Sequence, residues 1–282
     1  MSKEAVKSLL RPIARLLVKG RIVPKRIIIE MDGGICSQMH FYLLGRLIEQ
    51  SGGEKVYFDL EWFDKDGTDD ENRFARNFDL LKIFPSLEFR RQKKGFVRKI
   101  YNSLFYRFLD YREFRCTPDS VKTFKAPLYI DGYFNETEEF FKDFPTVFKI
   151  DPSLLPEDNK SLYERIKAAE SGKGACAVHI RRGDLAKPHP VYGNPLTPAD
   201  IVEKFNEMRR RNGEGIRYFV FSDEPDWFRD NVATELKDFD VTIADVNGSD
   251  RGWCDLILMT QCRHHIKSQG SMGKYAEYLS RR

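Results

Sequence analysis

The sequence predicts an α/β protein whose strands form mostly parallel sheets in two halves, and three observations support this. Residues 26–31 (RIIIEM) form a short β-branched run that ends at a glycine turn, and the apolar spacing over 37–50 then predicts a helix. Strand and helix patterns alternate strictly over 175–279, as in a sheet covered by helices. The prolines within 151–159 indicate a hinge between the halves.

The N-terminal half contains two further strand signals. Residues 55–60 (KVYFDL) follow the first helix at βαβ distance and are expected to pair beside the first strand. Residues 127–133 (PLYIDGY) predict a strand and a turn, and a short helix is expected over 136–144. Between the strands expected at 55–60 and 127–133, the segment 64–111 is rich in charged and aromatic residues. Its basic block over 90–99 predicts a helix with a solvated cationic face or, alternatively, a contact surface for an acidic partner.

The C-terminal half follows a regular order, and the chain is predicted to comprise an N-terminal domain over 1–155 and a C-terminal domain over 156–282. In a parallel sheet, ligands bind beyond the carboxyl ends of the strands, so the residues after each strand are the ones to inspect. The expected strands are 175–180, 218–221, 241–244 and 265–267, and the expected helices are 198–212, 225–235, 254–262 and 272–279.

Composition excludes several classes of protein. A chain of 282 residues with 41% hydrophobic content can bury a substantial core, and a formal net charge of +4 is too small for a nucleic-acid-binding signature. Five cysteines without a CxxC pair indicate reduced thiols in a cytosolic protein. No run of about 20 apolar residues and no signal peptide are found, so a cytoplasmic location is expected.

The first 20 residues predict a basic amphipathic helix with a cation at every fourth position. One interpretation places this helix on anionic lipid, as a peripheral contact at the inner face of the plasma membrane. The alternative is a helix packed on its own domain with a solvated basic face.

The segment from His179 to Asp184 (HIRRGD) is the strongest candidate for chemistry. A buried strand ends there in Arg181 and Arg182, and an arginine fork matches phosphate oxygens and can stabilise a departing diphosphate. The alternative is a structural ion pair between Asp184 and one of the two arginines.

Two glycine loops are weaker candidates for binding an anion at the start of a helix. The first follows the strand over 26–31 and contains Gly33, Gly34, Ser37 and Gln38. The second opens the last helix and contains Gly270, Ser271 and Met272. Either loop, taken alone, can be an ordinary turn or helix cap.

Three polar residues and the histidines complete the analysis. Ser222 and Asp223 follow a strand, and Asp223 either binds a ribose hydroxyl or caps the next helix. Asp255 can accept two hydrogen bonds from the Watson–Crick edge of guanine, or it is an ordinary acid in the first turn of a helix. The histidines have no metal-ligand spacing, so no metal site is predicted.

In this order, the segments resemble the α-1,2-fucosyltransferases of glycosyltransferase family eleven, from about Ile27 to Leu279. The glycine motif of that family, GGLGNQMFQYA, is similar to 33–40 (GGICSQMH), and its HxRRxD motif is met in full by 179–184. Shorter stretches at 131–134, 221–223 and 255–262 are also similar to the family pattern.

The resemblance implies a GT-B-type fold with two Rossmann-like domains facing across a cleft. It also implies a GDP-fucose donor held mainly by the C-terminal half, inversion at the anomeric carbon, and neither a metal nor another cofactor. On this basis Arg181 grips the β-phosphate, His179 and Asp255 contact the nucleoside, and Ser271 with Met272 backs the diphosphate. The implied acceptor is a glycan, either free or linked to a lipid. The implied context is the cytoplasmic assembly of a bacterial surface polysaccharide.

Departures from the family pattern leave alternatives. Ser37 replaces an asparagine, His40 replaces a phenylalanine, and the last loop reads QGSMGKYAEY where NSTFSWWGAY is common. Another GDP-deoxysugar donor or an unusual acceptor therefore stays open. Two hypotheses from other classes are also retained. One is a non-catalytic nucleotide- or phosphoglycan-binding protein that uses the same cleft, and the other is a membrane-surface adaptor that acts through the N-terminal helix and the basic block over 90–99. Asp32, His40 and His189 flank the predicted ligand loops and are the candidates for the general base.

Overall fold

The computed structural model describes residues 3–65, 67, 76–189 and 192–280, and this part of the chain is α/β. It divides into two compact units. Unit 1 comprises Met1–Leu81 and Pro85–Lys142, and unit 2 comprises Lys82–Phe84 and Asp143–Arg282. Residues 151–159, predicted as a hinge, form 3-10 turns within unit 2. Among the described residues, no helix is long and apolar enough to cross a membrane.

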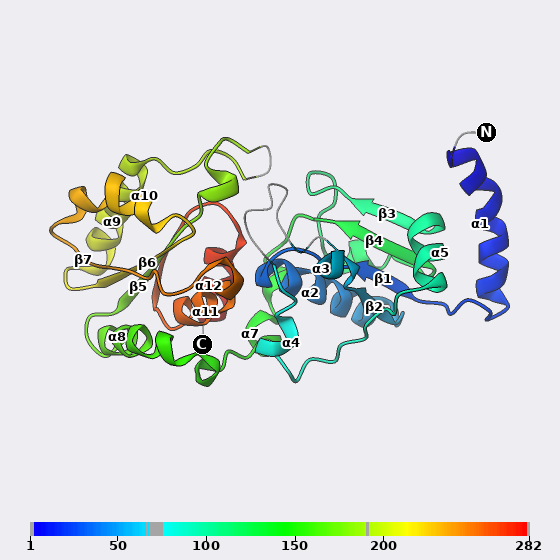
Figure 1. Ribbon diagram of the computed structural model, residues 1–282, viewed down its shortest axis with the longest axis horizontal. Helices are drawn as coiled ribbons and strands as arrows, with labels where there is room; N and C mark the ends of the chain where they lie inside the picture. The colour runs from blue at the N-terminus through cyan, green and yellow to red at the C-terminus, as the bar shows by residue number, and fades with distance from the viewer. Residues whose placement is uncertain (1–2, 66, 68–75, 190–191, 281–282) are drawn as a thin grey trace. The chain divides into compact units, whose positions relative to one another are not determined.

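Unit 1 is built around a parallel four-stranded sheet in the order β2-β1-β4-β3 (Figure 1). The predicted pairing of the first two strands is confirmed. Its elements are α1 (Lys3–Lys19), β1 (Ile27–Glu30), α2 (Ile35–Gly52), β2 (Val56–Asp59), α3 (Glu61–Lys65), α5 (Phe96–Leu104), β3 (Tyr106–Leu109), α6 (Pro118–Val121) and β4 (Leu128–Gly132), with the first residues of α4 (Leu80–Ile83).

Both faces of the unit 1 sheet are covered, so the apolar run over 27–29 of its central strand β1 is fully buried. On one face, Ile28 and Tyr129 pack with α1 and α5, which contribute Ala14, Val18 and Tyr101. Helix α2 contacts β1 and β2.

Unit 2 contains a second parallel four-stranded sheet, in the order β7-β6-β5-β8. Figure 1 labels its strands β5, β6 and β7. Its elements are α7 (Phe144–Val147), α8 (Lys160–Glu170), β5 (Ala175–Ile180), α9 (Pro198–Asn212), β6 (Arg217–Ser222), α10 (Pro225–Asn231), β7 (Asp240–Ile243), α11 (Gly252–Met259), β8 (His264–Lys267) and α12 (Ser271–Ser280). The alternation of strands and helices predicted for this half is confirmed, and α8 is an addition to it.

Side chains of β5 alternate between two apolar layers, as a buried strand requires. Val178 and Ile180 join Phe205 of α9 and Phe228 of α10 in one cluster. His179 points to the other layer, where the first turn of α12 passes close to it. The close passage depends on Gly273, because a Cβ there would lie 3.1 Å from the His179 Cβ.

The five cysteines are free and buried, in agreement with the prediction of reduced thiols. Burial raises the pKa of Cys116, and also that of Cys254, to about 12. Such thiols are chemically inert while the fold is intact.

Candidate functional site

The strand order of unit 2 identifies where a ligand is expected. The chain runs outward from β5 to β6 and β7 and then returns to the other side of β5 with β8, so the order reverses between β5 and β8. In open parallel sheets, a crevice forms at such a reversal beyond the carboxyl ends of the strands. The residues after β5 and β8 are the HIRRGD segment and the second glycine loop, so two of the three predicted segments meet at this point.

Arg181 is held firmly at this reversal. Its backbone N–H donates to the Ser268 Oγ at 2.7 Å, which joins the end of β5 to the loop after β8. Its guanidinium forms ion pairs with Asp184, Nη2 to Oδ1 at 2.8 Å, and with Asp223, Nη1 to Oδ2 at 2.9 Å. Of the two carboxylates, Asp184 is the more exposed, with 43% of its side chain accessible against 11% for Asp223.

Asp223 does not cap the next helix, so that interpretation is wrong. Its Oδ1 accepts the backbone N–H of Arg182 at 2.9 Å while its Oδ2 pairs with Arg181. Residue 224 is the N-cap of α10 and makes no side-chain cap bond. Ser222 Oγ instead accepts the backbone N–H of Glu224 at 3.1 Å. The carboxylate of Asp223 therefore organises both arginines from the end of β6.

Arg182 is occupied differently from Arg181. Its guanidinium carbon lies 3.6 Å from the centre of the Trp227 ring, and its Nε lies 3.3 Å from Glu224 Oε2. A guanidinium stacked on an aromatic face gains both cation–π attraction and packing. Trp227 was not among the predicted site residues, although its position in the first turn of α10, directly after β6, is a signal that could have indicated it.

His179 lies under the glycine loop as a neutral, buried base. It is 6% exposed, and burial together with the charge of Arg181 lowers its pKa to about 3. Among the described residues, no hydrogen-bond partner reaches its Nδ1. A Cβ on Gly270 would lie 3.7 Å from Arg181 Cγ and 3.9 Å from His179 Cε1, so this loop covers both side chains directly.

Asp255, in the first turn of α11, is half-buried and held by a polar network that the sequence analysis missed. Asn247 Nδ2 donates to its Oδ1 at 2.8 Å, and Asn247 also exchanges two hydrogen bonds with the fully buried Asn159. Burial raises the pKa of Asp255 to about 7, against the opposing effects of Asn247 and Arg251. Asn247 follows β7, so a search of all strand ends would have found it.

The other predicted residues of unit 2 are Ser271, Met272 and His189, and their contacts do not indicate a particular role. Met272 packs near Gly252, whose added Cβ would lie 3.4 Å from the Met272 Cε, while Ser271 is exposed at the start of α12. His189 accepts the backbone N–H of Tyr192 at 3.3 Å, and its own backbone bridges to Gly193.

Unit 1 has its own strand-order reversal, between β1 and β4, and the first glycine loop lies there. Tyr133 follows β4, and its hydroxyl donates a hydrogen bond to Asp32 and lies 3.2 Å from Ser37 Oγ. Burial raises the pKa of Asp32 despite the hydrogen bond from Tyr133. Gly33 has a φ of +69°, and a Cβ there would lie 2.7 Å from Ser37 Oγ. Gly34, the N-cap of α2, makes no side-chain cap bond.

Two predicted residues of this loop have structural partners. Gln38 is fully buried, its Nε2 donates to the carbonyls of Gly33 and Asn77, and its Oε1 accepts two backbone N–H groups from 79–80. His40 Nδ1 lies 2.8 Å from Glu136 Oε1, and its ring stacks on Phe134 with centroids 3.7 Å apart. The part of these residues in binding or catalysis stays a prediction.

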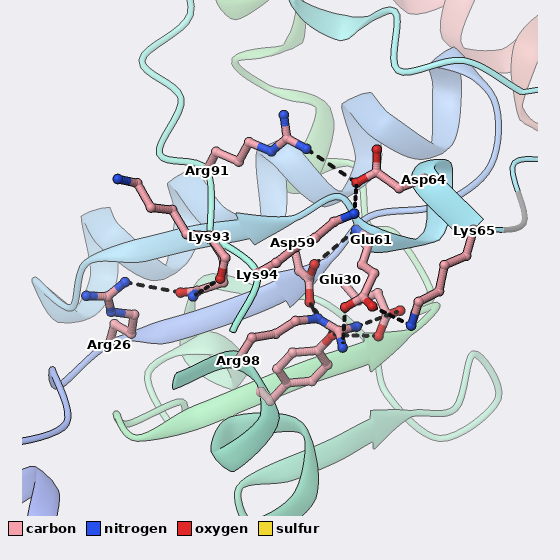
Figure 2. A network of polar contacts seen from close by, with 12 residues as sticks. Arg26, Glu30, Asp59, Glu61, Asp64, Lys65, Arg91, Lys93, Lys94 and Arg98 are labelled. Carbon is pink, nitrogen blue, oxygen red and sulfur yellow. Dashed lines mark hydrogen bonds and ion pairs between the residues drawn. The ribbon is translucent and has the colours of Figure 1, made fainter. Parts of the chain in front are cut away.

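A charged network braces the same edge of the unit 1 sheet (Figure 2). Arg98 of α5 forms ion pairs with Asp59 and Glu61, and its Nη2 lies 4.0 Å from Glu30 Oε1. The Tyr129 hydroxyl lies 2.7 Å from Glu30 Oε2 and 2.8 Å from Asp59 Oδ2, and its single proton can serve only one of them at a time.

Much of the predicted basic block over 90–99 is therefore committed inside unit 1. Besides Arg98, Arg90 pairs with Glu49 at 2.6 Å. Figure 2 shows that Asp64 forms ion pairs with both Arg91 and Lys94. Among the described residues, no group of three or more His, Cys, Asp or Glu side chains is arranged to hold a metal ion.

Unit 2 is therefore an α/β unit whose parallel sheet presents two arginines, a buried histidine and a glycine loop at its strand-order reversal, the point at which open sheets of this kind bind ligands. Comparison with known sequences makes the class specific. The chain belongs to Glycosyl transferase family 11, whose profile matches residues 80–282.

Several curated relatives share one name. Galactoside alpha-(1,2)-fucosyltransferase 1 of Aotus azarae is 31% identical over 134 residues, which cover 45% of this chain and 35% of that protein. The proteins of the same name from Mico humeralifer and Saimiri boliviensis boliviensis are 30% identical over 134 and 131 residues. The match thus spans about a third of the length of these relatives.

Proposed function

We propose that this chain transfers L-fucose from GDP-fucose to a glycan hydroxyl, the 2-hydroxyl of galactose, with inversion and without a metal. Membership of Glycosyl transferase family 11 and the names of the relatives support the transferase class and the fucosyl donor. The observation that carries the proposal is Arg181, fixed between two carboxylates at the strand-order reversal of unit 2. The two parallel-sheet units support the GT-B type.

Arg181 is suited to stabilise the leaving group. The less exposed Asp223 fixes the guanidinium from the end of β6, whereas the more exposed Asp184 pairs with it on a side that solvent reaches. In the proposal, a diphosphate oxygen displaces Asp184 and receives the same fork of N–H donors. A preorganised donor stabilises developing negative charge without reorganising during the reaction.

In the proposed reaction, an acceptor oxygen attacks the anomeric carbon while the bond to the β-phosphate oxygen breaks and GDP departs with the electron pair. The acceptor proton goes to a general base. Asp32 is the base we favour, because burial raises its pKa toward the working range and Tyr133 fixes its orientation. His179 and Asp255 are assigned to the nucleoside, for which a neutral imidazole and a hydrogen-bonded carboxylate are suitable partners.

The test uses radiolabelled GDP-fucose with a panel of β-galactosides, with and without a chelator. Arg181→Ala should lower kcat/KM by roughly 100-fold to 1,000-fold, as loss of one preorganised donor does elsewhere. Arg263→Ala is the matched control, because Arg263 pairs with Glu170 before β8 begins, at the opposite end of the strand. Absence of both transfer and GDP binding refutes the proposal, and loss of activity with chelator refutes its metal-free form.

A second candidate is a non-catalytic protein that binds a nucleotide or phosphoglycan, or a transferase for another GDP-deoxysugar. These alternatives rest on the departures from the family pattern at Ser37 and His40. Both side chains have partners within unit 1, Tyr133 for Ser37 and Glu136 for His40. A binding protein would retain GDP affinity without turnover, and a panel of GDP-sugars in a thermal-shift assay would identify a different donor.

A further inference from the structure

Helix α1 exposes a continuous apolar stripe to solvent. Leu9, Ile13 and Leu16 are 64%, 54% and 65% exposed, and Ile22 in the following turn is 73% exposed. Val6 and Leu10 flank them at 41% and 44%. Residues spaced three and four apart share one face of a helix, so Val6, Leu9, Ile13 and Leu16 form a single surface on α1. A helix packed on its own domain with only its basic face in solvent does not account for this exposed apolar stripe.

This stripe is not the face that attaches α1 to unit 1. Ala14 and Val18 are buried against α5 and the sheet, and Arg11 Nε donates to the Leu104 carbonyl at 3.2 Å. At about 100° per residue, these positions point to a different side of the helix from Leu9, Ile13 and Leu16. Helix α1 therefore has one apolar face inside the fold and a second one outside it.

Charge indicates what covers the outer face. Residues 1–29 contain eight basic residues and one acidic residue, although the net charge of the whole chain is only +4. The remainder of the chain is consequently net negative. Arg15, Lys19 and Arg21 are exposed beside the apolar stripe. An anionic bilayer satisfies both features at once, because apolar side chains enter the acyl boundary while cations pair with headgroups.

We propose that α1 and the turn after it attach this protein to the surface of an anionic lipid membrane. A second copy of the chain is disfavoured as the occupant, because symmetric pairing of the stripe would bring the two basic flanks together. The basic block over 90–99 is not the main contact, because Arg90, Arg91, Lys94 and Arg98 already pair with carboxylates of unit 1. The inference is independent of the proposed transferase activity.

Flotation of the full chain with lipid vesicles tests the proposal. The protein should float with vesicles containing phosphatidylglycerol, and should do so less with phosphatidylcholine alone or at high salt. The combined variant Leu9→Ser, Ile13→Ser and Leu16→Ser should lower the partition coefficient by about 100-fold or more. Leu154→Ser is the matched control, since Leu154 is an exposed leucine of unit 2.

A second pair of variants tests the charges. Arg15→Glu with Lys19→Glu should weaken binding to anionic vesicles by at least about 25-fold, from about fivefold for each cation lost. Lys173→Glu with Lys237→Glu changes net charge equally at exposed positions of unit 2 and should have a much smaller effect. Circular dichroism and thermal unfolding establish that each variant is folded.

Three results would overturn the proposal: no flotation of the unmodified chain with anionic vesicles, equal flotation of the triple serine variant, or equal effects of the two charge-reversal pairs. Sedimentation that reveals a dimer abolished by the serine substitutions would assign the stripe to a second copy instead. Transfer to a soluble acceptor should be unchanged in the serine variant, which keeps this test separate from that of the proposed function.

Discussion

Replacing Asp255 with asparagine should remove the part of the pH dependence of stability that comes from this carboxyl. The pKa of this carboxyl is raised from 3.8 to about 7, chiefly by burial, so the folded protein binds its proton more tightly than the unfolded chain does. The resulting stabilisation is complete below pH 3.8 and is lost as the pH rises to about 7. Asparagine does not titrate and can still accept the hydrogen bond from Asn247.

The size of the effect follows from the size of the shift. A difference of about three pKa units corresponds to about 4 kcal/mol, since each unit is worth 1.36 kcal/mol. The side chain is partly exposed, so solvent screening should reduce the measured value to about 2 kcal/mol or somewhat more. The free energy of unfolding of Asp255→Asn, relative to the unmodified protein, should therefore increase by this amount between acidic and mildly alkaline pH.

Urea unfolding at a series of pH values measures this difference. Asp200→Asn is a control of opposite sign, because hydrogen bonds from Thr197 lower the pKa of Asp200 and its stabilisation is lost as the pH falls. If the difference between Asp255→Asn and the unmodified protein were the same at pH 4.5 and at pH 8, the assigned burial of this carboxyl would be wrong.

Two further substitutions test the edges of the sheets. Tyr129→Phe should destabilise unit 1 by roughly 1–3 kcal/mol in urea unfolding, because a buried hydroxyl between two carboxylates is lost. Tyr106→Phe should cost less, because Tyr106 is more exposed. Equal costs would contradict the role given to the buried Tyr129 hydroxyl. Gly270→Ala should cost roughly 1–3 kcal/mol at its positive φ and also weaken GDP binding in calorimetry, because the loop covers Arg181. Gly213→Ala, at a φ of +85° with open space around it, should lower stability alone, and unchanged GDP affinity in both glycine variants would contradict the assigned position of the loop.

The elements that the sequence predicted best are those whose ends carry strong local signals. The strand over 175–180 and the helix over 198–212 have the predicted bounds. Thr197 and Asp200 form a capping box at the start of this helix, and Pro198 occupies its first position. The helix ends at Gly213, so local chemistry sets both of its limits.

Two of the missed elements, β3 and α8, lack such signals. Strand β3 is an edge strand whose Tyr106 and Phe108 are exposed, so its apolar residues do not form the expected buried pattern. Helix α8 is mostly polar and buries only Leu162, Ile166 and Ala169. In both cases the contacts that stabilise the element come from distant parts of the chain, which local periodicity cannot reveal.

The role of the candidate site stays a prediction, but the structure shows which of the predicted residues lie together and which partners the sequence did not indicate. The strand-end rule located Arg181 and the loop around Gly270, and the structure brings them together. The expected ion pair with Asp184 is confirmed, and it involves Arg181 itself. The second carboxylate, Asp223, comes from a neighbouring strand, and pairing across strands depends on the register of the sheet rather than on sequence spacing.

The distribution of the buried thiols makes each unit its own reporter of unfolding. Cys36 and Cys116 belong to unit 1, whereas Cys176, Cys254 and Cys262 belong to unit 2. A maleimide reagent can modify them only when the surrounding core opens. Mass spectrometry of the labelled peptides over a denaturant series would thus record two separate opening free energies from the natural chain, without an engineered probe.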